Sequence, residues 1–466
     1  MPERYHIHVA TVPGRFRRVG KFGSVDWRED CSRCTNCVKP RCQYDVYKKE
    51  DAHNRDPVAP VQPLFECKCC LSCVQGCTKG LLSLSINPEY LDMGDEYWRP
   101  DLIATTWNQS DAGKIPVSGA GYRGRFFGPG FDSIWTDMSE IVRPTRDGIH
   151  GREYISTAVD IGPKPLRLEF KATGEMLSAE SPLIEIQMPL VLDVPPWPLA
   201  GSRLSLARIA AAKALKVLAV VPPQDMAAVP ADQMPYAVPL LADAETTRWD
   251  GLLKQVRLVE LVDGPGVQAA AERVRKAAPK AIVAVRMDLV RGVADRILAL
   301  AEKSGIKVFH LSADLHGREI GAERPRHIKD AMREVHGRLV TQGIRDEVTL
   351  IVGGGIALPE HVAKAVICGA DLVAVDVPLL VALGCRVCRG AHASGDAVVC
   401  PAEAEDADGA YATQRMTNLM GAWHSQLIEV LGAMGIREVR RLRGEVGRAM
   451  FMEDIEREAF GDFART

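Results

Sequence analysis

The second half of the chain contains eight short apolar runs rich in β-branched residues, and these constrain the fold most. Helical patterns such as LSLARIAAAKAL and GVADRILALAEKSG lie between most of them. Parallel strands joined by crossover helices have this order, so the sequence predicts an α/β fold, a (β/α)8 TIM barrel, with a doubly wound open sheet as the alternative. The connection between the second and third runs is short for a full helix, so we expect one helix to be missing or replaced. The runs are residues 189–194, 216–221, 236–241, 256–262, 281–286, 308–313, 349–354 and 372–376.

Composition indicates an ordinary soluble protein of two or three domains. The chain has 466 residues, of which 47% are hydrophobic and 25% charged, and its formal net charge is -2. Such a neutral chain has no overall field to attract nucleic acid or an anionic membrane. No run approaches the roughly 18 apolar residues of a membrane span, and the first residues lack the apolar core of a secretory signal. We therefore expect a cytoplasmic protein, in which most of the thirteen cysteines are clustered and hold metal rather than form disulfides.

Eight of the cysteines form two similar groups near the N-terminus. Each group has three cysteines at three-residue steps and a fourth further on, a pattern that places three thiolates around one iron–sulfur cube. Two zinc sites are the alternative, but zinc sites usually combine pairs of cysteines, so triplets favour iron–sulfur. The first group is Cys31, Cys34, Cys37 and Cys42, and the second is Cys67, Cys70, Cys73 and Cys77.

These groups resemble a bacterial-type ferredoxin module that carries two 4Fe–4S clusters. In such modules the fourth cysteine of each group binds the other cluster, which implies that Cys77 joins the first triplet and Cys42 the second. The spacing departs from the usual pattern, because four residues precede Cys42 and no proline follows Cys42 or Cys77. About thirty residues separate the groups and include the loop PVAPVQP at 57–63. Cys69 is out of step and is interpreted as a spare thiol.

A glycine motif in the middle of the chain is misleading. GAGYRG at 119–124 matches G-x-G-x-x-G, but a dinucleotide site needs a strand before the motif and a helix after it. Pro116 precedes this motif and GRFFGPG follows it, so we interpret it as a connecting loop.

In a barrel, functional residues lie at the carboxyl ends of the strands. Gly353, Gly354 and Gly355 end the seventh run, where backbone N–H groups commonly bind a phosphate. Flavin mononucleotide (FMN) is the phosphate-bearing cofactor that we expect beside iron–sulfur clusters. Arg286 would lie near N1 of the flavin, and Ser312 ends the neighbouring sixth run. Asp376 would repel a phosphate, and it is also placed to cap the helix VPLLVALG. The other polar residues expected at this end are Asp193, Asp263, Asp288, Asp314 and His316.

A third cysteine group follows the last strand, at Cys385, Cys388 and Cys400. Three thiolates suit a 3Fe–4S cluster, or a 4Fe–4S cluster with an outside ligand. Residues 349–388 resemble the end of the FMN barrel of the glutamate synthase family, in its ferredoxin-bearing archaeal-type form. Residues 147–170 resemble the entry into that barrel, and the tract from RMTNLMGAW onward resembles the family's helical tail.

The resemblance implies an oxidoreductase, acting on CH–NH2 donors or within a redox complex, that moves electrons between the clusters and FMN. It also implies partners: ferredoxin, or NAD(P)-dependent, flavin-dependent or glutaminase-like subunits of a larger complex. VPPWPLAG at 194–201 and SADLHGREIGAE at 312–323 depart from the family's flavin-contacting loops. No cysteine nucleophile follows Met1, and no convincing NAD(P) motif is present. The alternative is therefore an electron-relay or scaffold subunit whose degenerate barrel makes no glutamate.

The sequence divides into four predicted parts. Residues 1–95 form the ferredoxin-like domain, 96–180 an irregular linker region, 181–400 the barrel and 401–466 a helical tail. In the tail, apolar residues share one helical face, interpreted as core packing with a partner interface as the alternative. They are Met416, Leu419, Met420, Trp423, Leu427, Val430 and Leu431. Arginines at 437, 440, 441, 443 and 448 are interpreted as a solvated helix face, with docking of an acidic partner as the alternative.

Overall fold

The computed structural model describes residues 5–32, 34, 38–44, 69–115, 129–136, 155–164, 169–176, 182–197, 202–242, 249–388, 402 and 408–461. Several predicted features lie outside these residues. They are Cys37, Cys67, Cys400, the loop at 57–63 and the glycine motif at 119–124.

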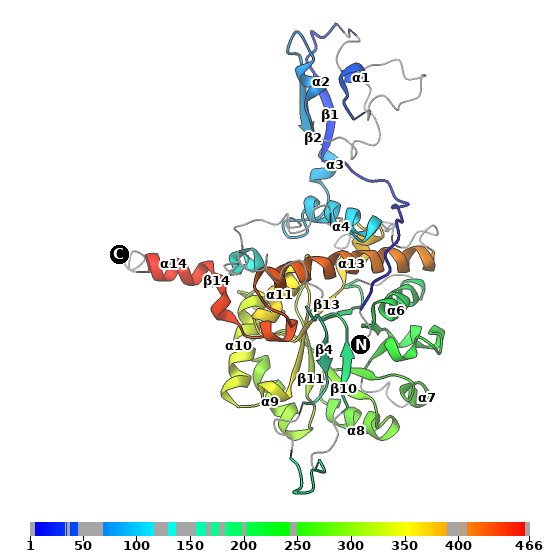
Figure 1. Cartoon of the computed structure of the whole chain (residues 1–466), viewed down its shortest axis with the longest axis vertical. Helices are drawn as coiled ribbons and strands as arrows, with labels where there is room; N and C mark the ends of the chain where they lie inside the picture. The colour runs from blue at the N-terminus through cyan, green and yellow to red at the C-terminus, as the bar shows by residue number, and fades with distance from the viewer. Residues whose placement is uncertain are drawn as a thin grey trace.

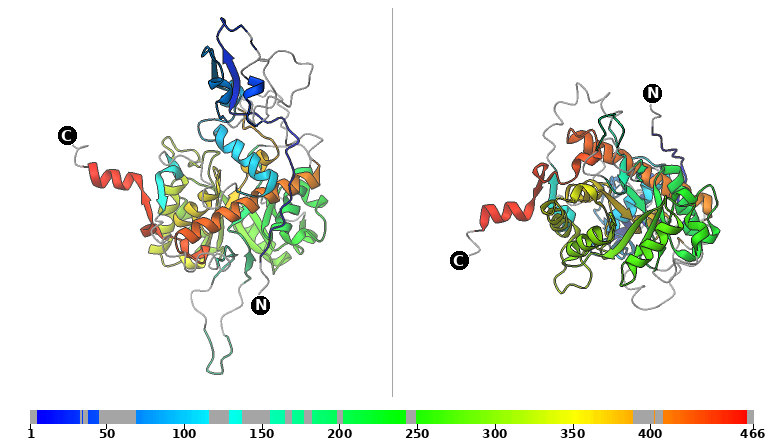
Figure 2. Two further views of the ribbon diagram at one scale, coloured as in Figure 1. Left: turned by 45° about the horizontal axis from the view of Figure 1, so that its top comes forward. Right: turned by 90° about the horizontal axis from the view of Figure 1, so that it is seen from below.

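The eight predicted runs form a closed parallel barrel, seen along its axis in the right-hand view of Figure 2. Each strand pairs with the next along the chain, and β13 pairs with β6 to close the ring. The TIM barrel is therefore confirmed and the open sheet is excluded. The strands are β6 (Leu190–Leu192), β7 (Leu218–Val221), β8 (Ala237–Leu241), β9 (Leu258–Val262), β10 (Ile282–Asp288), β11 (Val308–Ser312), β12 (Thr349–Gly353) and β13 (Leu372–Val375).

Helices cover the outside of the barrel at every crossover but one. Between β7 and β8 the chain makes two short 3-10 turns, η5 (Pro223–Ala228) and η6 (Met234–Tyr236), as the short connection predicted. Prolines at both turns remove backbone donors and so prevent a longer helix. The outer helices are α6 (Arg203–Leu215), α7 (Asp250–Leu253), α8 (Val267–Ala277), α9 (Val293–Lys303), α10 (Ile328–Thr341), α11 (Pro359–Ile367) and α12 (Val377–Ala382).

The long helix α13 (Gly409–Ala433) lies across the barrel, against α6, α11 and α4 (Pro100–Ala112). The predicted apolar face of α13 is buried there, with Met416 and Leu419 at 0% exposure, so core packing is confirmed. Arg415 is fully buried beside this face and donates to the Ala382 carbonyl at 2.5 Å and to the Asp111 carboxylate at 2.7 Å. Helix α4 lies in the stretch that was expected to be irregular.

The N-terminal cysteine module projects from the barrel in Figure 1. Its strands β1 (Phe22–Trp27) and β2 (Leu82–Ile86) form an antiparallel pair. The short helices α1 (Val38–Arg41), α2 (Ser72–Gln75) and α3 (Pro88–Leu91) accompany this pair. Two segments connect the module to the body, residues 5–21 before β1 and residues 87–99 after β2.

The tail after α13 contains η10 (Val439–Leu442), η11 (Val446–Arg448), β14 (Ala449–Phe451) and α14 (Met452–Phe460). Strand β14 pairs with β3 (Ile134–Thr136), which follows the 3-10 turn η2 (Gly130–Ser133), while β4 (Val159–Ile161) pairs with β5 (Ile184–Ile186). None of the described helices is long and apolar enough to cross a membrane.

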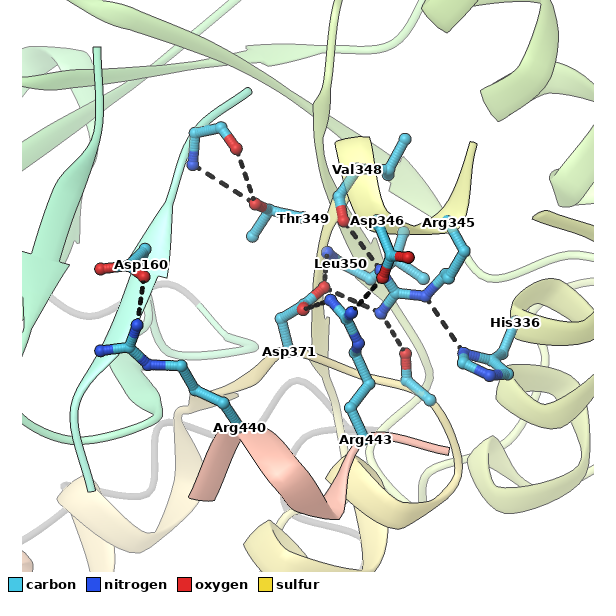
Figure 3. A network of polar contacts seen from close by, with 12 residues as sticks. Asp160, His336, Arg345, Asp346, Val348, Thr349, Leu350, Asp371, Arg440 and Arg443 are labelled. Atoms are coloured by element: carbon cyan, nitrogen blue, oxygen red, sulfur yellow. Dashed lines mark hydrogen bonds and ion pairs between the residues drawn. The ribbon is translucent and has the colours of Figure 1, made fainter. Parts of the chain in front are cut away.

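The prediction that the tail arginines form a solvated helix face is wrong. Arg440 donates to Asp160 at 2.6 Å and Arg443 donates to Asp371 at 2.8 Å, both on the barrel side (Figure 3). Arg448 donates to the Met434 carbonyl. These arginines lie on 3-10 turns and the segments that flank them. The ion pairs of Arg443 attach the tail near the amino ends of β12 and β13, and that of Arg440 attaches it to β4.

Candidate functional site

Four ionisable side chains converge inside the barrel, three from the neighbouring strands β9, β10 and β11 and one from the residue that follows β6. Arg286 on β10 donates from Nε to Glu260 on β9 at 3.0 Å and from Nη2 to Asp193 beyond β6. His310 on β11 lies 2.9 Å from the Glu260 carboxylate through Nδ1, and 3.0 Å from Arg286 Nη2. Glu260 and His310 are buried, at 1% and 0% exposure. The cluster is therefore a fixed, water-poor charge network below the barrel mouth.

The charges in this network stabilise one another. Burial opposes ionisation of Glu260, but the nearby His310 and Arg286 outweigh it and lower the pKa of this carboxyl. Burial likewise opposes the charge of Arg286, but Asp193 and Glu260 raise the pKa of the guanidinium above its ordinary value. Sequence analysis missed Glu260 and His310. The available signal was a charged or titratable residue inside each apolar strand, in LVELV and VFHLS.

Asp376 follows β13 and caps helix α12, as the sequence predicted. Its carboxylate accepts a hydrogen bond from the Val377 N–H at 2.6 Å. Burial raises the pKa of Asp376 to about 7, and the negative charge of Asp193 contributes to the shift. Near neutral pH this carboxyl is therefore partly uncharged.

The glycine turn after β12 packs against the loop that follows β11. Gly354 and Gly355 have φ values of +91° and +66°. A Cβ on Gly354 would lie 2.5 Å from the Ala313 carbonyl oxygen, and one on Gly355 would clash with the Gly317 nitrogen. Glycine is required at both positions for close backbone packing. Ser312 pairs with Gly353 where the two strands end.

The segment that leaves the N-terminal module covers this turn. Tyr97 is partly buried and donates its hydroxyl hydrogen to the Gly355 carbonyl, and burial raises its pKa. Trp98 donates its indole N–H to the Leu315 carbonyl at 2.9 Å. His316 Nε2 lies 2.9 Å from the Asp95 carboxylate, and this bond raises the pKa of the imidazole. Tyr97 had not been predicted as part of the site.

The residues at the barrel mouth fit an FMN phosphate when the Asp376 carboxyl is protonated. The turn at Gly353–Gly355 and the amino end of α12 follow the neighbouring strands β12 and β13, and the cation of Arg286 lies on β10. Ionised Asp376 would repel the phosphate from the amino end of α12, whereas the protonated carboxyl could donate a hydrogen bond to it. The assignment of Arg286, Ser312 and the glycines to a flavin site stays a prediction.

The third cysteine group begins where α12 ends. Cys385 is buried, and its sulfur accepts a hydrogen bond from the Val387 N–H at 3.5 Å. Cys388 is partly exposed. Val387 has φ +48°, a left-handed conformation that is rare for a β-branched residue. Such strain persists only where the surroundings enforce it, and it often marks functional sites. Cys400 lies outside the described residues.

The N-terminal cysteines occupy both buried and exposed positions. Cys42 and Cys73 are buried, Cys31 and Cys77 are partly exposed, and Cys34 and Cys70 are exposed. The Cys77 sulfur accepts a hydrogen bond from the Leu81 N–H at 3.3 Å. Within the described ranges, no three His, Cys, Asp or Glu side chains are arranged to hold a metal ion. Each predicted cluster has one ligand outside those ranges, so all three clusters stay predictions.

Comparison with known proteins shows a similarity to glutamate synthases. The conserved region of glutamate synthase matches residues 321–437, which run from the β11–α10 loop through α13. The archaeal-type glutamate synthase (NADPH) of Dehalococcoides mccartyi is 23% identical over 90% of this chain and 93% of its own length. The archaeal glutamate synthase (NADPH) of Methanocaldococcus jannaschii is 26% identical over 75% of this chain and 81% of its own length. The chain is therefore similar to archaeal-type glutamate synthases.

The Archaeoglobus fulgidus archaeal glutamate synthase (NADPH) is 36% identical to this chain, over 28% of the chain and 27% of its own length. These similarities support the predicted class, an oxidoreductase. Among solved structures, a mutant flavocytochrome b2 with benzoylformate has a TM-score of 0.42 at 14% identity, over 78% of this chain and 81% of that one. That likeness is too distant to support a conclusion.

Proposed function

We propose that the chain is an iron–sulfur flavoprotein subunit of the glutamate synthase type, in which the N-terminal module exchanges electrons with a partner. One observation carries the proposal. The segment Cys385–Cys388 continues directly from the barrel and is hydrogen-bonded to the segment that leaves the N-terminal module, through Gly94 N–H and the Arg386 carbonyl at 2.9 Å. The predicted redox centres would therefore follow one another from the two clusters of the module, through the third cysteine group, to the FMN of the barrel.

Each part of the chain would have a separate task. The two N-terminal groups would hold 4Fe–4S clusters, and the group at Cys385, Cys388 and Cys400 a third cluster. Bound FMN would supply the conversion between one-electron and two-electron chemistry. Arg286 would offer a cation near the flavin ring, at an orientation held by Glu260 and His310. Tyr97 and Trp98 would keep water from the barrel mouth.

The partners follow from what this chain would need. The relatives from D. mccartyi and M. jannaschii are named as NADPH-dependent enzymes, whereas this sequence has no convincing NAD(P) motif. We therefore propose that electrons arrive from ferredoxin or from a nucleotide-dependent subunit, and nitrogen from a glutaminase-like subunit. If glutamate is the product, the barrel would bind 2-oxoglutarate and reduce the imine that it forms with ammonia.

An electron-relay or scaffold role is the second candidate, favoured by the charges of the barrel. Arg286 is paired with two carboxylates, from Asp193 and Glu260, and Asp376 lies close by. A dicarboxylate such as 2-oxoglutarate would find no free cation among these four residues. The same scaffold could then pass electrons to another subunit without making glutamate.

Anaerobic purification tests these proposals. We expect oxidised-flavin absorbance and about eight to twelve iron atoms per chain, from two or three clusters. Zinc in place of iron would end the cluster assignment, and a chain with full iron but no flavin would end the flavin assignment. Glutamate formation from 2-oxoglutarate, ammonia and reduced ferredoxin would favour the enzyme, and its absence in a flavin-loaded sample would favour the relay.

A further inference from the structure

Arg386, between two cysteines of the third group, contacts the N-terminal part of the chain at three points. Its carbonyl oxygen accepts the Gly94 N–H at 2.9 Å. Its Nη1 donates to the Glu89 carboxylate on α3 at 2.8 Å, and its Nη2 donates to the Arg17 carbonyl at 3.0 Å. The two segments that connect the module to the body, residues 5–21 and 87–99, therefore meet at this one side chain.

The residues around Arg386 allow little freedom. A Cβ on Gly384 would lie 2.6 Å from the Phe16 ring, and one on Gly94 would clash with the Trp98 carbonyl oxygen. Both glycines have positive φ, +103° and +68°. Val387 is buried at 4% exposure in its left-handed conformation. The cysteine segment is thus held against both connecting segments by close backbone packing as well as by charge.

We propose that Arg386 is a positioning residue for electron transfer, which fixes the third cysteine group at a set distance from the N-terminal module. This inference rests on the proposed function, because it assumes that both sites carry clusters. If both sites carry clusters, one electron would pass from the module to the third cysteine group, and no bond would be made or broken. A one-electron donor of the reduced-ferredoxin class would supply the electron. The side chain acts through the geometry of the contact and does not accept the electron.

The chain offers a set of matched variants. Arg386→Gln removes the charge at nearly constant length, Arg386→Lys keeps the charge, and Glu89→Gln removes the other half of the pair. Arg17→Gln is the control, because the Arg17 side chain is 61% exposed and pairs with the same Glu89 at 2.7 Å. Its backbone carbonyl, which binds Arg386, is unchanged by that substitution.

Two measurements on the full chain test the proposal. Amide hydrogen exchange followed by mass spectrometry reports the contact whether or not clusters are present. In Arg386→Gln we expect exchange at residues 87–98 to rise by about tenfold or more, since a hydrogen bond to a charged group typically contributes at least that factor. After rapid reduction with dithionite and freezing, electron paramagnetic resonance should show slower reduction of the third centre and weaker coupling to the module, at unchanged iron content.

Arg386→Lys should recover part of the rate at which the third centre is reduced. Glu89→Gln should slow that reduction as Arg386→Gln does, but to a smaller extent. The double variant Arg386→Gln with Glu89→Gln should be no slower than Arg386→Gln alone, because both remove one interaction. An iron-replete Arg386→Gln protein with unchanged amide exchange and an unchanged rate of third-centre reduction would overturn the proposal. An equal fall of that rate in Arg17→Gln would also overturn it. If the unaltered chain has no third-centre signal, the proposed function fails instead, while hydrogen exchange still reports on the contact.

Discussion

Replacing Asp371 with asparagine should destabilise the barrel strongly, because this carboxylate joins three separate elements (Figure 3). It accepts hydrogen bonds from Arg345 at 2.9 Å, from Arg443 at 2.8 Å and from the Leu350 N–H at 2.8 Å. The side chains of Arg345 and Asp371 are 4% and 7% exposed. Removing one partner of a buried ion pair leaves an uncompensated charge and typically costs about 3–5 kcal/mol. We expect a loss near the lower limit, about 3 kcal/mol, because Arg443 is 22% exposed and can be partly hydrated.

The effect should depend on pH in a defined direction. Burial opposes ionisation of Asp371, but Arg345 and Arg443 outweigh it and lower the pKa of the carboxyl in the folded chain. A lowered folded pKa stabilises the protein above the unfolded value of about 3.9, and this stability is lost as the pH falls through the folded value. The difference in unfolding free energy between Asp371→Asn and the parent should therefore be largest at pH 7 and should become smaller below about pH 4.

Urea unfolding followed by circular dichroism at pH 7 measures the loss. Asp346→Asn is the matched control, because Asp346 pairs with the same Arg443 at 2.5 Å but is 73% exposed. A surface pair of this kind is worth about 0–1 kcal/mol. If Asp371→Asn costs no more than Asp346→Asn, the argument that burial makes this network strong is refuted.

Three further predictions concern the barrel mouth, helix α11 and the third cysteine group. Asp376→Asn should raise the affinity for FMN at pH 8. It should also remove the part of the pH dependence of FMN binding that follows a group of pKa about 7. Fluorescence titration at pH 6 and pH 8 measures both effects. Glu360 has a carboxylate oxygen buried without a hydrogen-bond partner, and burial raises its pKa to about 7. Ionisation of Glu360 therefore destabilises the folded state increasingly as the pH rises from the unfolded pKa to about 7. Glu360→Gln should be more stable than the parent by on the order of 1–3 kcal/mol at pH 8, and equally stable near pH 4. A larger gain at pH 4 than at pH 8 in thermal unfolding would contradict this prediction. Cys385→Ser should lose the iron of the third cluster only, whereas Cys368→Ser should keep all iron, since burial raises the pKa of that thiol to about 12; iron analysis distinguishes them.

The strands of the barrel were predictable because each is buried on both faces and reads as a continuous apolar run. The Asp376 cap and the buried face of α13 were also predictable, since both depend on residues close together in the sequence. The sequence pattern predicts the structure correctly where the contacts that determine it join residues close together in the sequence.

The interior charge network was not predictable in this way. Glu260 and His310 point into the barrel, but the direction of a side chain on a strand is fixed only when the ring closes. Tyr97 reaches Gly355 across 258 positions of the sequence, so no local pattern signals that contact. The tail arginines were misread for the same reason, because their carboxylate partners lie on distant parts of the barrel.

The closure of the ring between β6 and β13 has a consequence for synthesis of the chain on the ribosome. The first barrel strand must wait for the last, and α6 must wait for α13, which ends at Ala433 of 466 residues. Until then β6 keeps an unpaired edge and the buried face of α6 has no cover, features that favour aggregation. Folding of the barrel should therefore follow the synthesis of α13, and nascent chains ending before Gly409 should depend on chaperones to stay in solution.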